Sequence, residues 1–188
     1  AAAHLLRERN IQAQSVDILI YVGVYPDYFV PGNAFVLQKR LGLPKDSIVF
    51  DVSLACSGFV YGLQICSALL SASSAKRALL LVGDSTSKTV SPLDTSRLLF
   101  GDGGGAMLLE KEDGRDTSLQ FGMKSDGSRF KTIIVPAGGF RLPAASSEMM
   151  PWGDGNKRSD YNLYMNGTDV FSFTMTDVPD LFREFMEH

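Results

Sequence analysis

Short apolar runs alternate along the chain with longer stretches whose apolar positions follow a helical period. The runs I-L-I-Y-V (18–22), I-V-F-D-V (48–52) and K-R-A-L-L-L-V-G-D (76–84) have strand length, and their continuous apolar character is typical of strands buried on both faces. A helix is expected from about Asn33 to Gly42, and a long helix is expected to open at S-L-A-C-S-G. This alternation predicts an α/β fold with a mainly parallel sheet and helices on both faces.

The remainder of the chain has a different pattern of hydrophobic and polar residues. Residues 1–13 read as a helix, and from about residue 97 the pattern predicts successive strands with turns at Asp113-Gly114 and Asp126-Gly127. The segment 136–160 is rich in Gly, Pro and Ser, so we expect a mobile loop there. The last segment predicts an amphipathic helix, with core-facing side chains at Phe171, Phe173 and Phe182. We expect a single α/β domain over residues 1–188.

Both ends of the sequence look cut. The first residues read as the middle of a helix without an N-cap, and the last residues stop inside a helical pattern without a Gly or Asn terminator. We therefore expect a part of a longer protein, truncated at both ends.

Composition narrows the class of function. Hydrophobic residues make up 45% of the chain, charged residues make up 21%, and the net charge is −3. Interspersed charges give no single-sign field for nucleic acid or anionic membranes, and no apolar run is long enough for a bilayer span. The sequence shows no signal-peptide pattern, so we expect a cytoplasmic protein without nucleic-acid or membrane partners.

No metal or cofactor site is expected either. His4 and His188 stand at the two extremities, and no His, Cys and Asp cluster has metal-ligand spacing. Cys56 and Cys66 fall on one predicted helix with Cα atoms about 15 Å apart, whereas a disulfide requires less than about 7 Å. Each thiol therefore needs its own explanation.

Cys56 is the candidate catalytic residue. It follows the strand 48–52 and stands at the expected start of the long helix, where unpaired N–H groups and the helix dipole favour an ionised sulfur. Its small neighbours leave room for a substrate carbonyl, and its own N–H could hold an oxyanion, so the position suits acyl transfer. The alternative is a buried, inert thiol, since cysteine is among the most buried residue types. For Cys66, mid-helix among apolar residues, packing is the expected role.

Several motifs in order resemble the β-ketoacyl-acyl carrier protein synthase III family, which has a thiolase-like fold. The motifs are D-V-S-L-A-C-S-G-F-V-Y-G-L around Cys56, Y-P-D-Y-F-V-P-G-N-A with Q-K-R-L-G before it, and L-L-F-G-D-G-G-G-A-M-L-L-E and L-Y-M-N-G-T-D-V-F-S-F after it. Only about 24 residues before Tyr161 stand outside the match. The resemblance identifies the chain with the N-terminal half of the family's fold.

The resemblance implies a condensing reaction. Cys56 would take an acyl group from acyl-coenzyme A or an acyl carrier protein, and malonyl-acyl carrier protein would then supply a carbanion by decarboxylation. The family's His and Asn for decarboxylation, and its Gly for the oxyanion hole, lie in the other half of the fold, so this fragment alone should be inactive. The resemblance also implies a homodimer, paired through the strand 77–83. Alone, the fragment should be oligomeric or poorly soluble, because half of a fold exposes apolar surface.

Two departures from the family pattern bear on the substrate. Where the family has an Asp-Arg pair whose Arg helps hold coenzyme A, this chain has Asp94-Thr95, and Arg97 stands two positions late. An acyl carrier protein donor is therefore favoured. Where many relatives have a Phe that lines the partner subunit's acyl pocket, this chain has Val30, which predicts a donor longer or more branched than acetyl.

Other interpretations stay open. G-D-G-G-G-A (101–106) partly imitates a dinucleotide fingerprint but runs into a predicted strand, so its glycines are expected to give a tight backbone path near the active site. A thiolase-fold acyl transferase without condensation is one rival function. A non-catalytic fragment or partner subunit is the other.

Overall fold

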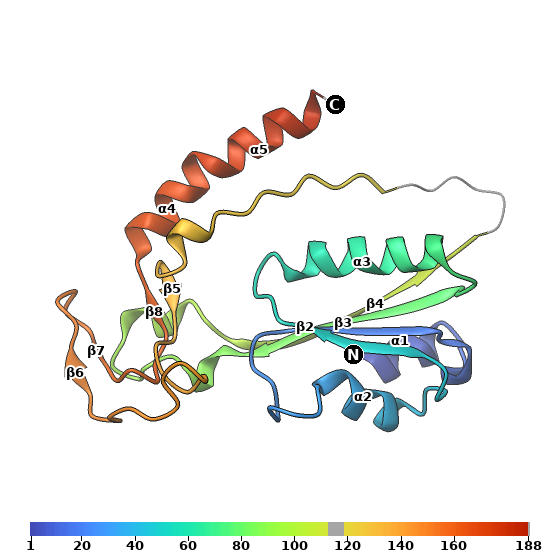
Figure 1. Cartoon of the computed structure of the whole chain (residues 1–188), viewed down its shortest axis with the longest axis horizontal. Helices are drawn as coiled ribbons and strands as arrows, with labels where there is room; N and C mark the ends of the chain where they lie inside the picture. The colour runs from blue at the N-terminus through green and yellow to red at the C-terminus, as the bar shows by residue number, and fades with distance from the viewer. Residues whose placement is uncertain (113–118, 188) are drawn as a thin grey trace. The chain divides into compact units, whose positions relative to one another are not determined.

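Four strands form the central sheet of the computed structural model, which describes residues 1–112 and 119–187. They are β1 (Ile18–Val22), β2 (Ile48–Val52), β3 (Arg77–Ser85) and β4 (Asp102–Glu110), in the order β2-β1-β3-β4 (Figure 1). β1 pairs in parallel with both β2 and β3. β4 runs antiparallel to β3. The hydrogen bond from the Lys111 N–H, just after β4, to the Lys76 carbonyl, just before β3, shows this direction. The predicted mainly parallel, mixed sheet is confirmed.

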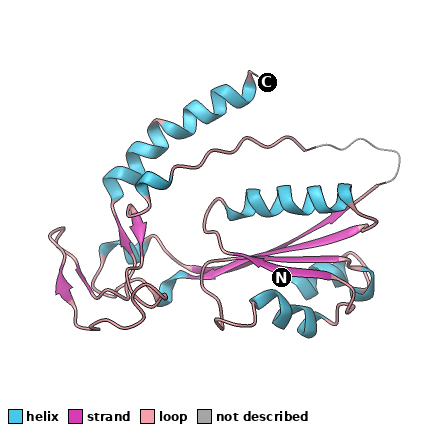
Figure 2. Ribbon diagram, viewed as in Figure 1, coloured by secondary structure: helices cyan, strands magenta, loops and turns pink. Residues whose placement is uncertain are grey.

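Helices cover both faces of this sheet, as the sequence predicts. Figure 2 shows α3 (Gly58–Ala72) on one face, with α1 (Ala2–Glu8) and α2 (Asn33–Leu41) on the other. Side chains of β1 alternate between the two cores: Ile18, Ile20 and Val22 pack with the α3 side, and Leu19 packs with the α1 and α2 side. The apolar run of β1 is therefore continuous because both of its faces are buried.

Single residues in the sequence decide where two of the helices end. α2 begins at Asn33 and ends at Gly42, whose left-handed backbone (φ 70°) matches the predicted C-terminal glycine. The first helix is shorter than the predicted 1–13. It ends at Glu8, Asn10 follows with φ 52°, and a 3₁₀ turn then spans Ala13–Ser15. Asn is one of the few residues that adopt the left-handed region readily, which explains the early end.

Two glycines of α3 allow the helix to lie directly on the sheet. A Cβ at Gly62 would stand 2.6 Å from Leu80 Cδ1, and a Cβ at Gly58 would clash with Val22 Cγ1. These contacts join α3 to the end of β1 at Val22 and to the middle of β3 at Leu80. Any larger residue would lift the start of α3, and with it the turn that carries Cys56.

The chain divides into two compact units. One contains residues 1–84 and the described residues of 102–121, and the other contains residues 85–101 and the described chain from Gly122 onward. The second unit holds the 3₁₀ turns Thr86–Lys88, Thr95–Leu98 and Gly127–Arg129 and six further elements: β5 (Ile133–Ile134), β6 (Met150–Pro151), β7 (Lys157–Arg158), β8 (Tyr164–Met165), α4 (Gly167–Met175) and α5 (Asp177–Met186). The expectation of one domain over 1–188 stays a prediction.

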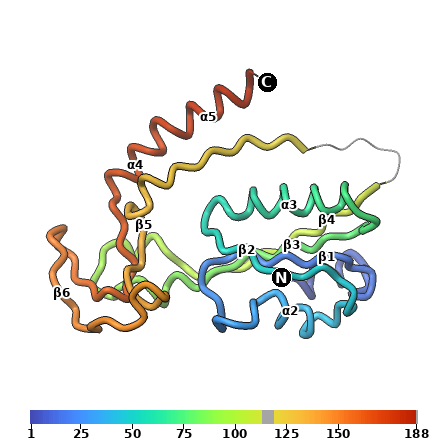
Figure 3. Tube along the Cα trace, viewed as in Figure 1, coloured from blue at the N-terminus to red at the C-terminus, as the bar shows by residue number. Residues whose placement is uncertain are grey.

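The strand expected after β4 is absent from the described residues. The turn at Asp113-Gly114 lies outside the described chain, in the grey part of the trace in Figure 3. Residues 119–126 have no strand assignment, and Figure 2 draws no strand directly after the grey trace. The predicted strand was wrong because alternating polarity fits a strand only where a neighbouring strand accepts its hydrogen bonds. The turn at Asp126-Gly127 is present, with the Asp126 side chain accepting from the Ser128 N–H.

Two other expectations for the second unit need correction. The segment 136–160 contains an antiparallel β6–β7 pair and a buried arginine, so it is not a featureless loop, although its mobility stays a prediction. Phe171, Phe173 and Phe182 are 67%, 47% and 64% exposed, so they do not face a core. An amphipathic pattern shows that a helix has an apolar face. It does not show which element packs against that face, and no element within the described residues covers these three side chains.

We predict that Gly62→Ala destabilises the complete protein by about 1–3 kcal/mol, because the added methyl group overpacks against Leu80. Ser71→Ala, on the exposed side of the same helix, is the control and should leave stability within about 0.5 kcal/mol of wild type. Denaturant unfolding measures both variants. Equal stability of Gly62→Ala and wild type would contradict the close packing of α3.

Candidate active site

Cys56 lies in the tight turn between β2 and α3. The Gly58 N–H donates to the Ala55 carbonyl at 2.8 Å, which closes the turn, and Cys56 is exposed. The helix itself begins at Gly58, so Cys56 precedes the first turn of α3 rather than belonging to it. The alternative of a buried thiol is wrong, while the catalytic role of Cys56 stays a prediction.

A cleft of about 240 Å³ opens beside this cysteine. Its walls come from the carboxyl ends of β1 and β3, the start of β4 and the turn before α3, and the lining residues are Val22, Leu54, Ala55, Cys56, Phe59, Val82, Gly83, Asp84, Gly103, Gly104 and Gly105. The carboxyl ends of parallel strands are a general place for ligand sites, because loops and helix N-termini converge there. The predicted location of Cys56 after a strand therefore places its sulfur at a cleft.

The glycine motif reaches the cleft from the start of β4. The motif continues into a strand, as its sequence predicts, and Gly103, Gly104 and Gly105 line the cleft that Cys56 also lines. A Cβ at Gly105 would stand 3.2 Å from Val82 Cγ2 across the β3–β4 pair. These glycines lie beside the candidate nucleophile, as expected, but only Gly105 makes a close contact, and a Cβ at Gly103 would meet nothing within 4 Å. The expected tight path is therefore found at Gly105 and not at Gly103.

The cleft has the parts that an acyl transfer step requires. An exposed thiol stands between small neighbours and apolar side chains such as Leu54 and Phe59, which can contact an acyl chain. No hydrogen bond within residues 1–112 and 119–187 engages the N–H of Cys56. A carbonyl oxygen that becomes negative during attack by the sulfur could accept from it.

The other thiol has a different environment. Cys66 is fully buried in the core between α3 and the sheet, and burial raises the pKa of its thiol to about 12. The predicted packing role of Cys66 is confirmed. The structure thus separates an exposed cysteine from an inert one on neighbouring parts of the chain.

Sequence reasoning missed one polar residue that lines the cleft, Asp84, and one that bonds to its lining, Tyr21. Asp84 lines the cleft, and its Oδ1 accepts from the N–H groups of Val24 and Tyr25 at 2.9 and 3.2 Å. Tyr21 donates from its hydroxyl to the Gly83 carbonyl at 2.6 Å, and burial is the main reason that its pKa is raised. Asp84 ends an apolar run directly before a loop, and that signal could have marked it.

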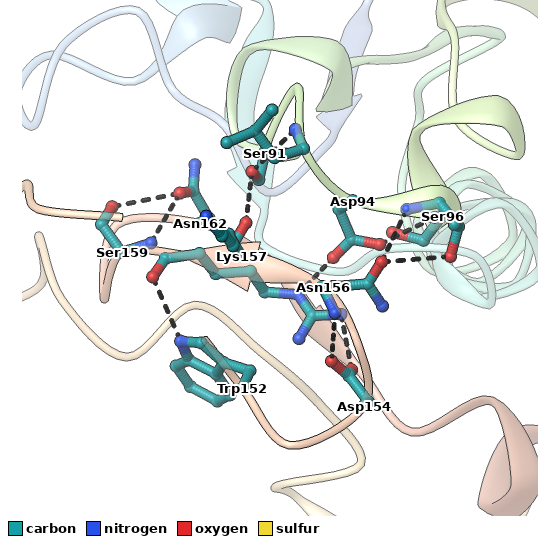
Figure 4. Close-up of polar contacts among 12 residues, drawn as sticks. Ser91, Asp94, Ser96, Trp152, Asp154, Asn156, Lys157, Ser159 and Asn162 are labelled. Carbon is teal, nitrogen blue, oxygen red and sulfur yellow. Dashed lines mark hydrogen bonds and ion pairs between the residues drawn. The ribbon is translucent and has the colours of Figure 1, made fainter. Parts of the chain in front are cut away.

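A second polar cluster, confined to the other compact unit, centres on Arg158. Figure 4 labels its neighbours Asp94, Asp154 and Trp152. Arg158 is only 2% exposed and pairs with the buried Asp94 and with Asp154. Its guanidinium also lies 5.7 Å from the Trp152 ring and 5.4 Å from the Tyr164 ring. The sequence carried no local signal for this cluster, because Asp94 and Arg158 are 64 positions apart.

The electrostatics of this cluster follow from its contacts. Burial by itself would raise the pKa of Asp94, but hydrogen bonds from Ser96 and Arg158 outweigh burial and hold that pKa below its usual range. The hydrogen bond from Arg158 is the main cause that lowers the pKa of Asp154 to about 2. Arg97 donates from Nη1 to the Pro92 carbonyl, so its guanidinium is held by its own turn.

Within the described ranges, no helix combines the length and apolar character that crossing a membrane requires. No group of three or more His, Cys, Asp or Glu side chains in the same ranges could hold a metal ion.

Comparison with known proteins points to one family. The family described as 3-oxoacyl-[acyl-carrier-protein (ACP)] synthase III matches residues 50–127, which include Cys56 and the glycine motif. A putative 3-oxoacyl-[acyl-carrier-protein] synthase 3 from Campylobacter jejuni is 35% identical over 100% of this chain and 53% of its own length. A β-ketoacyl-[acyl-carrier-protein] synthase III from Clostridium perfringens is 32% identical over 100% of this chain and 55% of its own length. The chain spans about half the length of the curated relatives it matches.

Solved structures agree with the sequence comparison. A crystal structure of 3-oxoacyl-(acyl-carrier-protein) synthase III matches 100% of this chain and 57% of its own with a TM-score of 0.94 and 37% identity. The synthase III of Pseudomonas aeruginosa matches 100% of this chain and 53% of its own with a TM-score of 0.79 and 32% identity. The fold is therefore the thiolase-like α/β fold over its N-terminal half, as predicted.

We predict that acid weakens the Arg158 cluster. In the unfolded chain Asp154 takes up a proton near its ordinary pKa of about 3.9, whereas in the folded protein its pKa is about 2. The stabilising contribution is therefore complete above about pH 4 and is lost as the pH falls toward 2. Unfolding free energies measured across this window should fall less steeply for Asp154→Asn than for wild type. Equal slopes would contradict the assignment.

Proposed function

Because the chain belongs to the 3-oxoacyl-[acyl-carrier-protein] synthase III family, we propose that the protein carrying it is a condensing acyltransferase with Cys56 as its nucleophile. It loads an acyl group onto Cys56 and condenses it with a malonyl thioester to give a 3-oxoacyl-acyl carrier protein. The reaction belongs to the initiation of fatty acid biosynthesis or to a related pathway. The observation that carries this proposal is the exposed thiol of Cys56 in a cleft at the carboxyl ends of β1 and β3.

The loading step uses groups that the chain itself supplies. The ionised sulfur of Cys56 attacks the thioester carbonyl, the new S–C bond forms, and the negative oxygen accepts from the Cys56 N–H. Collapse of this intermediate breaks the bond to the donor's sulfur, which leaves as a thiolate and takes up a proton. The acyl group stays activated because it remains a thioester, now on Cys56.

The condensation step completes the cycle. Loss of carbon dioxide from the malonyl thioester leaves an electron pair on carbon, which attacks the acyl carbon on Cys56. The new C–C bond forms and the sulfur of Cys56 leaves. The family resemblance assigns decarboxylation to a His and an Asn outside the matched half, so a protein limited to residues 1–188 is proposed to be inactive in condensation.

The donor is proposed to be an acyl carrier protein rather than coenzyme A. The family's Asp-Arg pair is replaced by Asp94-Thr95, and Asp94 is committed to Arg158 and to the Ser96 N–H. Arg97 stands two positions later, and its Nη1 donates to the Pro92 carbonyl. A cytoplasmic location and malonyl-acyl carrier protein as the second substrate follow from the same proposal, and no cofactor is required.

A homodimer is part of the proposal, but not through the strand first expected. Pairing through 77–83 is wrong, because β3 lies between β1 and β4 and both of its edges are already paired. β2 and β4 are the two outer strands of the described sheet, and Ile48 of β2 is 41% exposed. We therefore assign the pairing between subunits to the free edge of β2.

Acylation of Cys56 is the first expected result. In the complete protein, intact-mass analysis after exposure to acyl-carrier and acyl-coenzyme A thioesters should show one acyl adduct. The adduct should be lost in Cys56→Ala and retained in Cys66→Ala, the matched control, because Cys66 is buried with a raised pKa. Adduct without carbon–carbon bond formation would favour an acyl transferase that does not condense. No adduct from any donor would favour a non-catalytic subunit.

Donor length is the second expected result. Val30 is 81% exposed, and the resemblance places it in the partner subunit's acyl pocket, where it would leave more space than Phe. Wild type should therefore prefer donors longer or more branched than acetyl. Val30→Phe should shift kcat/KM toward short donors by about tenfold, and Val30→Ile should shift it much less. Strict acetyl preference of wild type, or a monomer in sedimentation, would contradict this role.

A further inference from the structure

The loop between β1 and α2 displays three large apolar side chains in a row. Tyr28, Phe29 and Val30 are 58%, 80% and 81% exposed. A loop that displays apolar groups needs its own backbone held, since those side chains contribute little burial. The hydrogen bonds of the loop backbone therefore set its position.

Side-chain oxygen atoms hold this loop at both ends. At its start, the Asp84 carboxylate accepts from the N–H groups of Val24 and Tyr25. At its end, Asn33 Oδ1 accepts from the Asp27 N–H at 2.9 Å. Asp51 then accepts from the Asn33 and Ala34 N–H groups at 2.6 and 2.7 Å, which caps the N-terminus of α2.

Asp84 differs from the other acceptors because it also lines the Cys56 cleft. The preceding residue, Gly83, lines the same cleft, and its carbonyl accepts a hydrogen bond from the Tyr21 hydroxyl. One side chain thus contacts the space beside the nucleophile and the backbone of the exposed loop. A group that fills the cleft and displaces the Asp84 carboxylate must stretch or break its bonds to Val24 and Tyr25.

We propose that Asp84 is a positioning residue that couples occupancy of the Cys56 cleft to the position of the 24–30 loop. An acyl chain on Cys56 would then be sensed by the loop that displays Tyr28, Phe29 and Val30. The consequence for acyl-chain selection rests on the function proposed above. The mechanical coupling itself rests only on the contacts of Asp84.

The sheet offers a matched control for this role. Asp17 also accepts two consecutive backbone N–H groups, those of Lys76 and Arg77, at 2.7 and 2.9 Å. It does so before β1, away from the lining of the cleft. Loss of Asp17 should therefore weaken the fold as loss of Asp84 does, without affecting the coupling.

Hydrogen exchange on the complete protein tests the coupling without any need for catalysis. Cys56 is alkylated with an iodoacetamide that carries a long alkyl chain, and amide exchange over residues 24–30 is compared with that of the unmodified protein. We expect a change of about fivefold, the scale of one backbone hydrogen bond. Wild type, Asp84→Asn and Asp17→Ala should show it, because an asparagine Oδ1 can still accept both protons. Asp84→Ala should not.

The outcomes separate this inference from the proposed function. Unchanged exchange in wild type, or the same change in Asp84→Ala as in wild type, would overturn the coupling even if thioesters acylate Cys56. A change that depends on Asp84 would support the coupling even if no thioester acylates Cys56. If Asp84→Ala does not fold, unchanged exchange in wild type still overturns the coupling, and Asp84→Leu, which has a similar size and no hydrogen-bond acceptor, takes the place of Asp84→Ala. In an active protein, Asp84→Ala should also alter the relative kcat/KM of short and long donors, and Asp84→Asn should restore it.

Discussion

The close approach of α3 to the centre of the sheet is the constraint on which the candidate site depends. Gly58 and Gly62 leave no side chain between the helix and Val22 or Leu80, so the turn before the helix lies at the ends of β1 and β3. The cleft and the exposed sulfur of Cys56 both follow from that position. Packing at the level of single methyl groups therefore controls where the nucleophile stands, because protein interiors have no free space to absorb a displacement.

Aspartate carboxylates accept hydrogen bonds from backbone N–H groups that no neighbouring strand pairs. Asp17, Asp51 and Asp84 each accept two consecutive backbone N–H groups from a connection beside the sheet. These protons would otherwise lack a partner where the ladder stops, and an unpaired buried N–H is costly. The same device serves three connections, yet only Asp84 places it at the cleft. The contact of Asp84 is therefore of the same kind as the other two, and only its place beside Cys56 connects it to the proposed function.

In the second unit, carboxylates also hold a connection in place, here through ion pairs to Arg158. Asp94 stands at the Asp position of the family's Asp-Arg pair, and it forms an ion pair that ties the turn at 95–98 to β7. A buried guanidinium needs such partners, because an unpaired buried charge is strongly unfavourable. The replacement of the family's Asp-Arg pair by Asp94-Thr95 thus accompanies a structural use of Asp94, which favours a carrier-protein donor in the proposed reaction.

The sequence by itself determined the elements whose signals are local. The apolar runs of β1, β2 and β3, the C-terminal Gly42 of α2 and the family motif around Cys56 are all readable within a few residues, because strand and helix periodicity depend on near neighbours. Tertiary structure alone decided the interior position of β3, the meeting of Gly103–Gly105 with Cys56, and the pairs Asp84–Val24 and Asp94–Arg158. These contacts join residues far apart in the chain. Which polar groups meet depends on strand order and on the direction of each connection, and no local pattern encodes either.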